Sequence, residues 1–282
     1  MTVSELKKNY LDALASAYSE NEINIIFSLF LEKVCGFDKI TQRSRMQAKL
    51  TPTQTTTLKQ YLAQLNTGQP YQQILGETEF YGLKFFVNEH VLVPRPETEE
   101  LLELAIGKIR ETAGSKRIKI LDIGTGSGII PIVLKKHFPE AEVSAIDLSE
   151  NALKTAKKNA DLHQVEINFI HQDYLSENLN DVYDVIISNP PYIGIDEEYE
   201  IAESVKAFEP KMALFSPNSN PLVFYEKIAE DCKKYLTPEG LVFMEINQKL
   251  GRETLDLFTK VLSEAELMED LSGNERIVWG RK

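Results

Sequence analysis

The hydrophobic positions at the start of the chain have the spacing of helices. Between residues 4 and 65, apolar side chains recur every three or four positions, and strand-like alternation is absent. Thr51 before Pro52 is typical of a helix start, because threonine caps free N–H groups and proline suits the first helical position. The pattern predicts a small helical domain over residues 1–73.

The spacing changes between residues 74 and 93. Apolar and aromatic residues stand there in short runs separated by Gly82 and by residues 88–90, which predicts short strands that form a β-hairpin. Pro94-Arg95-Pro96 then forms a rigid turn. A helix is expected over residues 97–112, because acidic residues occupy its first turn, as the helix dipole favours.

Beyond residue 116, short apolar runs alternate with helical patterns. Strands are predicted at residues 117–123, 141–146, 166–171, 182–188, 240–246 and near 276–280. Helices are predicted at about 128–137, 149–162, 221–236 and 250–264. Such alternation indicates parallel strands with helices on both faces of the sheet. The segments 266–271 and 276–280 flank Ser272-Gly273-Asn274 and predict a terminal antiparallel hairpin.

Composition and charge narrow the functional class. The chain has 282 residues, 43% of them hydrophobic, and a formal net charge of −12. The whole acidic excess lies beyond residue 90. Because binding to nucleic acid depends largely on Lys and Arg, this balance argues against a stable nucleic-acid partner.

The cysteines and the apolar segments indicate the compartment. Cys35 and Cys232 are far apart and form no CxxC pattern, so we expect free thiols and neither a disulfide framework nor a metal cluster. No apolar stretch reaches the roughly 20 residues that cross a bilayer. We therefore expect a cytoplasmic protein with no membrane partner and no metal.

A glycine-rich turn follows the first strand of the α/β part. Asp122 precedes Gly124, Gly126 and Gly128, where glycine permits positive φ and lets a ligand approach the free N–H groups of the next helix. Asp147 ends the next strand about 20 residues later, the spacing at which a carboxylate binds ribose hydroxyls in dinucleotide folds. This arrangement resembles the glycine loop of class I methyltransferases and favours an S-adenosylmethionine site over an NAD site.

A second motif, Asn189-Pro190-Pro191-Tyr192, stands at the end of the fourth strand of that part. The two prolines fix the backbone, so the Asn189 side chain and the Pro190 carbonyl become preorganised acceptors beside an aromatic ring. A planar amide or aryl-amine nitrogen attacks a methyl sulfonium poorly. Two acceptors that hold its N–H groups stabilise the transition state more than the ground state, and Tyr192 can stack on the planar group. The motif therefore predicts methylation of such a nitrogen.

Four other charged residues remain open to two interpretations. Arg95 either forms a wall of the site or is a solvated turn residue. Glu209 and Arg276 either line the pocket or form structural ion pairs. Glu245 ends a predicted strand and could face the site, but the pattern gives it no defined role.

Taken together, these motifs resemble the bacterial protein-(glutamine-N5) methyltransferase family, which methylates the glutamine of the Gly-Gly-Gln motif in peptide-chain release factors. The resemblance covers nearly the whole chain. Besides the two motifs above, it is carried by Pro70–Gly76 with Phe80-Tyr81-Gly82, Leu92–Glu99, Phe208-Glu209-Pro210 and Asn274-Glu275-Arg276.

The resemblance implies a fold and a division into domains. Residues 94–282 would form a Rossmann-like class I methyltransferase domain, with a mostly parallel seven-stranded sheet and a C-terminal antiparallel hairpin. The β-hairpin 74–93 would join it to the helical domain 1–73, which helps to dock the release factor.

The site residues follow from the same resemblance. The substrate glutamine would be held by Arg95, Asn189, Pro190, Pro191 and Tyr192, and of these Asn189, Pro190 and Tyr192 would be catalytic. S-adenosylmethionine, which becomes S-adenosylhomocysteine, would be bound by Asp122, Gly124, Thr125, Gly126, Ser127, Gly128, Asp147, Leu148, Asp173, Tyr174 and Asn189. Release factors 1 and 2 are the expected partners of a monomeric enzyme. Family members can carry tryptophan where this chain has Tyr174.

Three other functions fit parts of the pattern. Methylation of a glutamine in a ribosomal protein would use the same chemistry. Methylation of an exocyclic adenine amine in nucleic acid would use a similar motif, but the acidic charge of the catalytic half opposes it. An interaction module that has lost catalysis is disfavoured by the intact motifs. The acidic charge would instead attract a basic release factor.

Overall fold

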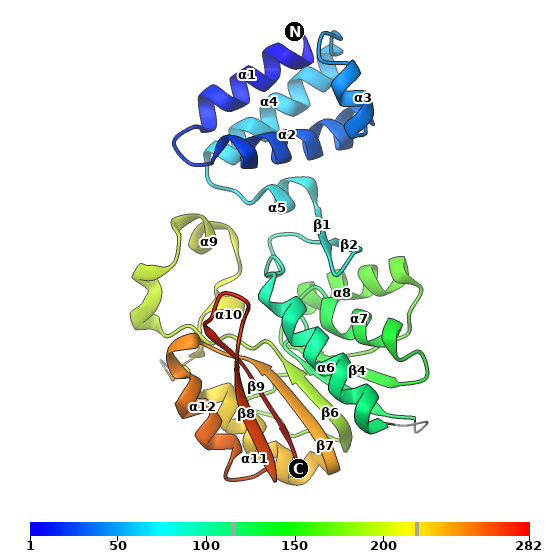
Figure 1. Cartoon of the computed structure of the whole chain (residues 1–282), viewed down its shortest axis with the longest axis vertical. Helices are drawn as coiled ribbons and strands as arrows, with labels where there is room; N and C mark the ends of the chain where they lie inside the picture. The colour runs from blue at the N-terminus through cyan, green and yellow to red at the C-terminus, as the bar shows by residue number, and fades with distance from the viewer. Residues whose placement is uncertain (114–116, 218–219) are drawn as a thin grey trace. The chain divides into compact units, whose positions relative to one another are not determined.

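The structure is a computed structural model that describes residues 1–113, 117–217 and 220–282. The chain divides into two compact units, both drawn in Figure 1. One contains Met1–Gly76 with Ala202–Phe208, and the other contains Glu77–Ile201 with Glu209–Lys282.

The first unit is helical, as the hydrophobic spacing predicts. Its helices are α1 (Val3–Leu14), α2 (Glu20–Cys35), α3 (Lys39–Ser44), α4 (Pro52–Asn66), α5 (Tyr71–Leu75) and α9 (Glu203–Phe208). Thr2, Ser19 and Thr51 begin α1, α2 and α4 with capping boxes, which satisfy N–H groups that have no partner inside a helix. Tyr10 and Phe27 lie at the centre of the buried core, with ring centroids 5.0 Å apart.

Helix α9 comes from a distant part of the sequence. The Gln73 side chain donates a hydrogen bond to the Phe208 carbonyl at 2.9 Å, and Gly68 lies against Ser204. No periodicity pointed to this addition. The residues 193–220 carry no regular pattern, and among the described ones the structure forms a 3₁₀ turn (Ile195–Glu200), α9 and α10 (Lys211–Leu214).

The second unit is built on a seven-stranded sheet (Figure 1). Its strands are β3 (Lys119–Ile123), β4 (Glu142–Asp147), β5 (Asn168–His171), β6 (Tyr183–Ser188), β7 (Leu236–Glu245), β8 (Glu264–Glu269) and β9 (Glu275–Arg281). Their order is β5-β4-β3-β6-β7-β9-β8; β9 pairs antiparallel with both β7 and β8, and the other neighbouring pairs are parallel. The expected mostly parallel sheet with a C-terminal antiparallel hairpin is confirmed.

Helices cover both faces of this sheet. On one face lie α6 (Glu97–Ala113), α7 (Ile129–His137) and α8 (Glu150–His163); on the other lie α11 (Val223–Tyr235) and α12 (Gly251–Phe258). Each face has its own buried cluster, one around Phe243 and Trp279 and the other around Tyr225 and Phe258. Among the described residues, every helix is too short or too polar to cross a membrane.

The main differences from the predicted boundaries concern the hairpin, the last helix and β7. The hairpin expected from residue 74 begins later, as β1 (Glu77–Phe80) and β2 (Leu83–Phe86), because Gly76 first ends α5 in a left-handed conformation with φ 72°. The helix expected over 250–264 ends at Phe258, since β8 already begins at Glu264. Strand β7 starts at Leu236, earlier than the expected residue 240, and its pairing with β6 shifts register between Tyr183 and Val185.

Gly128 sets the approach of α7 to α8. Its φ of 81° is a left-handed conformation that favours glycine, and a Cβ there would lie 3.0 Å from the Ala156 Cβ. This glycine is therefore needed for packing within the sheet unit, independently of any ligand.

Replacing Gly128 with alanine is expected to lower the free energy of unfolding by about 2–4 kcal/mol, from left-handed strain and overpacking together. Urea unfolding followed by the fluorescence of Trp279, the single tryptophan, reports on this unit. The matched control is Gly107→Ala in the exposed interior of α6, where nothing lies within 4 Å of the added Cβ. There alanine should stabilise by up to about 1 kcal/mol. Equal effects of the two substitutions would contradict the assignment.

Candidate active site

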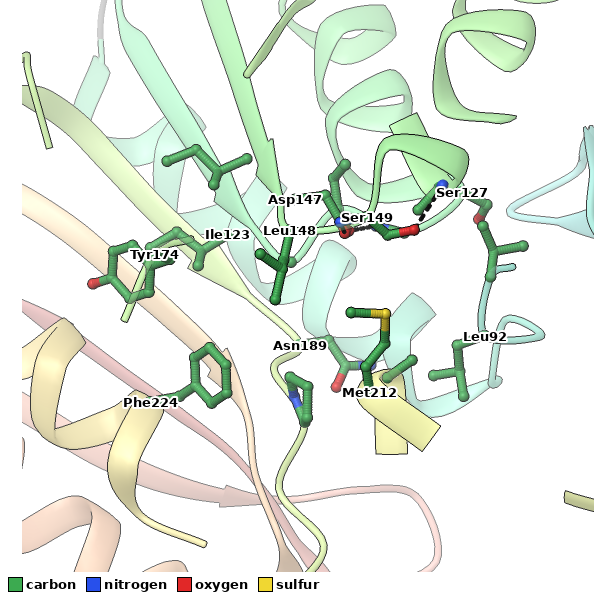
Figure 2. Close-up of a pocket in the computed structure, with 18 of the residues that line it drawn as sticks. Leu92, Ile123, Ser127, Asp147, Leu148, Ser149, Tyr174, Asn189, Met212 and Phe224 are labelled. Atoms are coloured by element: carbon green, nitrogen blue, oxygen red, sulfur yellow. Dashed lines mark hydrogen bonds between the residues drawn. The ribbon is translucent and has the colours of Figure 1, made fainter. Parts of the chain in front are cut away.

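A cavity of about 530 Å³ lies at the carboxyl ends of the parallel strands. Its lining includes the residues that follow β3, β4, β5 and β6, together with the loop before α6, helix α10 and the start of α11. The strand order reverses between β3 and β6, and open α/β sheets bind ligands at such a reversal. Figure 2 shows the pocket with the glycine-loop side near Ser127 and the opposite side at Asn189 and Met212.

The glycine loop is held in place by Asp147. Gly126 N–H donates to Asp147 Oδ2 and Ser149 N–H donates to Asp147 Oδ1, each at 2.8 Å. Gly124 and Gly126 adopt left-handed conformations, with φ of 77° and 54°, which alanine would strain. Burial raises the pKa of Asp147, while the N–H donors oppose that rise. Each oxygen keeps a second lone pair that can accept from a ligand hydroxyl.

Asp122 lies shortly before this loop in the sequence and is fully buried in β3. Neither of its carboxylate oxygens, nor Thr125 Oγ1, has a hydrogen-bond partner among the described residues. Burial raises the pKa of the Asp122 carboxyl to about 7. Buried polar atoms without partners cost free energy, so a cationic or hydrogen-bonding ligand group nearby would stabilise them.

An apolar part of the pocket lies on the other side of Asp147. Leu148, Tyr174 and Phe224 gather there (Figure 2). The Tyr174 hydroxyl donates to Asp231 Oδ2 at 2.8 Å, which fixes the ring with its aromatic body toward the cavity wall. A flat apolar wall beside an acidic residue that can take ribose hydroxyls suits a nucleoside. The orphaned Asp122, the glycine loop and this wall together fit S-adenosylmethionine.

Asn189 follows the last residue of β6 and faces the cavity. Its Nδ2 donates to Thr98 Oγ1 at 3.2 Å, in the first turn of α6. Thr98 in turn donates to Glu245 Oε2 at 2.6 Å, and Tyr192 donates to Glu245 Oε1 at 3.3 Å. Glu245 ends β7 and is only 2% exposed, and burial raises the pKa of its carboxyl.

The candidate residues from the sequence fall into two groups. The cavity wall contains Arg95, Gly124, Thr125, Gly126, Ser127, Asp147, Leu148, Asp173, Tyr174, Asn189 and Pro191. Asp122, Gly128, Pro190 and Tyr192 are not part of that wall. Gly128 packs α7 on α8, and the Tyr192 ring packs with the apolar cluster under α11 while its hydroxyl reaches Glu245.

The open interpretations of the charged residues now have answers. Arg95 lines the cavity and also donates to Glu209 at 2.6 Å. Glu209 is buried and accepts from the Val93 N–H as well, so it fixes the loop before α6. Arg276 pairs with Asp270 at 3.2 Å and does not line the cavity.

Several wall residues escaped the sequence analysis. Thr98 stood inside the quoted Leu92–Glu99 motif, and its place in the first helical turn was the available signal. Met212 had none, because it lies within the irregular residues 193–220. Phe224 lies at the start of the helix predicted over 221–236, but the helical pattern did not indicate that this turn lines the cavity.

Comparison with known proteins defines the class of this fold and site. The family model described as "Methyltransferase small domain" matches residues 103–207. Among solved structures, the hMettl16 catalytic domain in complex with the MAT2A 3'UTR hairpin 6 aligns with a TM-score of 0.54 and 16% identity, covering 82% of each chain. The T. thermophilus 16S rRNA N2 G1207 methyltransferase (RsmC) aligns with a TM-score of 0.50 and 16% identity, covering 73% of this chain and 49% of that one. The sheet unit therefore has a methyltransferase fold.

More similar relatives identify the family. The model "PrmC N-terminal domain" matches residues 5–76. A release factor glutamine methyltransferase of Flavobacterium psychrophilum is 42% identical over 99% of this chain and 98% of its own length. One from Enterococcus faecalis is 38% identical over 96% of this chain and 99% of its own length. The chain belongs to the release factor glutamine methyltransferases, which confirms the resemblance stated from its motifs.

The buried Asp122 carboxyl makes stability depend on pH. With a folded pKa of about 7, Asp122 keeps its proton in the folded protein while it ionises in the unfolded chain above about pH 4. Wild-type protein therefore loses stability as pH rises from about 4 to 7. An amide at this position cannot titrate. The unfolding free energy of Asp122→Asn minus that of the wild type should therefore increase by roughly 2–4 kcal/mol over that pH range and stay constant above it.

Urea unfolding of ligand-free wild type and Asp122→Asn, at pH values between about 5 and 8, measures this difference. A constant offset between the two proteins would show that Asp122 is ionised throughout.

Proposed function

We propose that this enzyme transfers a methyl group to the side-chain amide nitrogen of the glutamine in the Gly-Gly-Gln motif of peptide-chain release factors 1 and 2. The donor is S-adenosylmethionine, which supplies an electrophilic methyl group on a sulfonium, and the product is S-adenosylhomocysteine. The observation that carries the proposal is that Asn189, whose side-chain oxygen can accept from an amide N–H, lines the same cavity as Asp147 and Tyr174, the residues suited to a nucleoside.

The chain's own groups account for binding and orientation of the glutamine. Asn189 Oδ1 and Pro190 O accept no hydrogen bond from a described residue. Asn189 lines the cavity and Pro190 does not, but we assign both oxygens as acceptors for the two N–H groups of a primary amide. Holding both hydrogens draws the amide nitrogen toward the tetrahedral geometry of the transition state. Stabilisation that grows along the reaction raises turnover and not just affinity. Pro191 and Arg95 complete this wall of the site.

The donor is assigned to the opposite part of the cavity. Asp147 and Leu148 receive the ribose and one face of the adenine, and Asp173 and Tyr174 border the ring. Gly124, Thr125, Gly126 and Ser127 contact the methionine end of the donor, near the buried Asp122. A cationic amine of the donor near Asp122 would stabilise its buried carboxylate, whose oxygens have no hydrogen-bond partner among the described residues.

The proposal extends to the arrangement of the chain. Residues 1–73 serve as the docking domain for the release factor, the segment 74–93, which contains the hairpin β1–β2, connects the parts, and residues 94–282 carry the chemistry. The enzyme acts as a monomer in the cytoplasm without a stable nucleic-acid partner. The net charge of −12 supports a basic protein partner over an anionic one.

Incubation of the purified chain with methyl-labelled donor and release factor 1 or 2 should label one residue, the glutamine of Gly-Gly-Gln. Mass spectrometry locates the label, and release factor with that glutamine replaced is the control. Equal labelling of the control would refute the proposed substrate. Labelling of a ribosomal protein, or of adenine in nucleic acid, in place of the release factor would support the corresponding alternative.

Asn189→Ala should lower kcat by about a hundredfold or more, roughly the cost of losing one preorganised group that stabilises a transition state. The Kd of the donor, measured by calorimetry, should stay within about threefold, because the nucleoside contacts remain. Normal turnover combined with weakened donor binding would instead place Asn189 in the donor site alone.

A further inference from the structure

We propose that Glu245 and Thr98 are positioning residues that set which end of the Asn189 amide faces the substrate. Glu245 lies at the end of β7, Thr98 at the start of α6 and Asn189 at the end of β6, and one chain of hydrogen bonds connects the three. The inference deepens the proposed function and rests on it, because it concerns the acceptor that holds the substrate amide.

The direction of these hydrogen bonds follows from counting protons. A threonine hydroxyl has one proton, and while Glu245 is ionised the 2.6 Å contact commits that proton to Glu245 Oε2. Thr98 Oγ1 can then only accept from Asn189, and the amide end that donates is Nδ2. Asn189 Oδ1 is thereby left on the substrate side, as an acceptor for an N–H group.

The opposite orientation would disable the site. If the amide rotated by half a turn, Nδ2 would face the N–H groups of the substrate, and donor would meet donor. Asparagine alone has little preference between two orientations of similar shape. The preference must come from its neighbour, and Thr98 supplies it only while a carboxylate takes its proton.

Burial strengthens this control. Glu245 and Thr98 are each 2% exposed, so water has little access to the Thr98 hydroxyl as an alternative acceptor. The second oxygen of Glu245 accepts from the Tyr192 hydroxyl at 3.3 Å. One buried carboxylate therefore orders both ends of the Asn189–Tyr192 segment.

Thr98→Val tests the inference, because valine keeps the shape of threonine and removes the hydroxyl. We expect kcat for release factor methylation to fall about tenfold, a typical value for one buried hydrogen bond. The Kd of the donor and the KM for the release factor should stay within about twofold. Thr98→Ser, which restores the hydroxyl, should recover most of the lost turnover.

Two controls separate positioning from general damage. Thr254→Val in α12 also removes a buried hydroxyl, one with no hydrogen-bond partner among the described residues, and it should leave kcat within about twofold. In the Asn189→Ala background, Thr98→Val should cost no further turnover, because Thr98 acts only through Asn189. An equal cost in both backgrounds, or no cost in wild type, would overturn the inference.

A second pair of variants avoids the loss of the hydroxyl altogether. In Asn189→Asp, the new carboxylate and Glu245 compete for the single Thr98 proton, so kcat should fall. Adding Glu245→Gln supplies an N–H donor to Thr98 and frees its proton for the aspartate, and kcat should rise severalfold above that of Asn189→Asp alone. A double variant no better than Asn189→Asp would overturn the inference even if Thr98→Val does not fold.

The experiments distinguish failure of the proposed function from failure of the positioning role. A wild-type chain that binds the donor but never methylates the release factor glutamine would overturn both proposals. An active wild type whose Thr98 and Asn189 substitutions are simply additive would overturn only the positioning role.

Discussion

The reversal of strand order between β3 and β6 is the constraint on which the site depends. Strands added after β3 go first to one side, as β4 and β5, and then to the other, as β6 and β7. The helices that make these connections leave opposite faces of the sheet, so neither covers the carboxyl ends at the reversal. The glycine loop and Asp147 lie on one side of that opening, and Asn189 lies on the other. The two halves of a transfer reaction are thus brought to one edge by topology alone.

Fixing a side chain at that edge needs more than topology. Asn189 gains its orientation from Thr98, 91 positions away, and, beyond it, from Glu245, which is 147 positions from Thr98. On the facing side, Asp147 accepts from the N–H groups of Gly126 in the glycine loop and Ser149 before α8, which connects the loop to the end of β4. Both arrangements depend on a carboxylate, Glu245 or Asp147, and burial strengthens the hydrogen bonds that this carboxylate accepts. Hydrogen bonds therefore fix the polar groups of the site, Asp147 and Asn189, and the nucleoside part of the cavity is lined by apolar side chains.

Much of the sheet and of the site could be predicted, because short stretches of the sequence determine these elements. Strands β3 to β6 have apolar runs, the glycine loop has its spacing, and Asn189-Pro190-Pro191-Tyr192 follows a strand directly. Glu245 could be placed at a strand end, but its role depends on Thr98, and that contact is set by the packing of α6 against β7. Met212 stands in an irregular segment without periodicity, and Phe224 stands in a predicted helix whose contact with the cavity depends on long-range packing. Local pattern predicted the parts, and the long-range contacts between them needed the structure.

The discontinuous first unit has a consequence for synthesis on the ribosome. Helices α1 to α5 emerge early, but α9, which contributes the carbonyl that accepts from Gln73, is encoded after β6. Strands β3 to β6 are therefore synthesised before α9, the last helix that packs with α1 to α5. Domains fold from the N-terminus as they emerge, and here the early unit stays incomplete until the catalytic sheet has begun to form. Completion of the two units is in this way coupled in time.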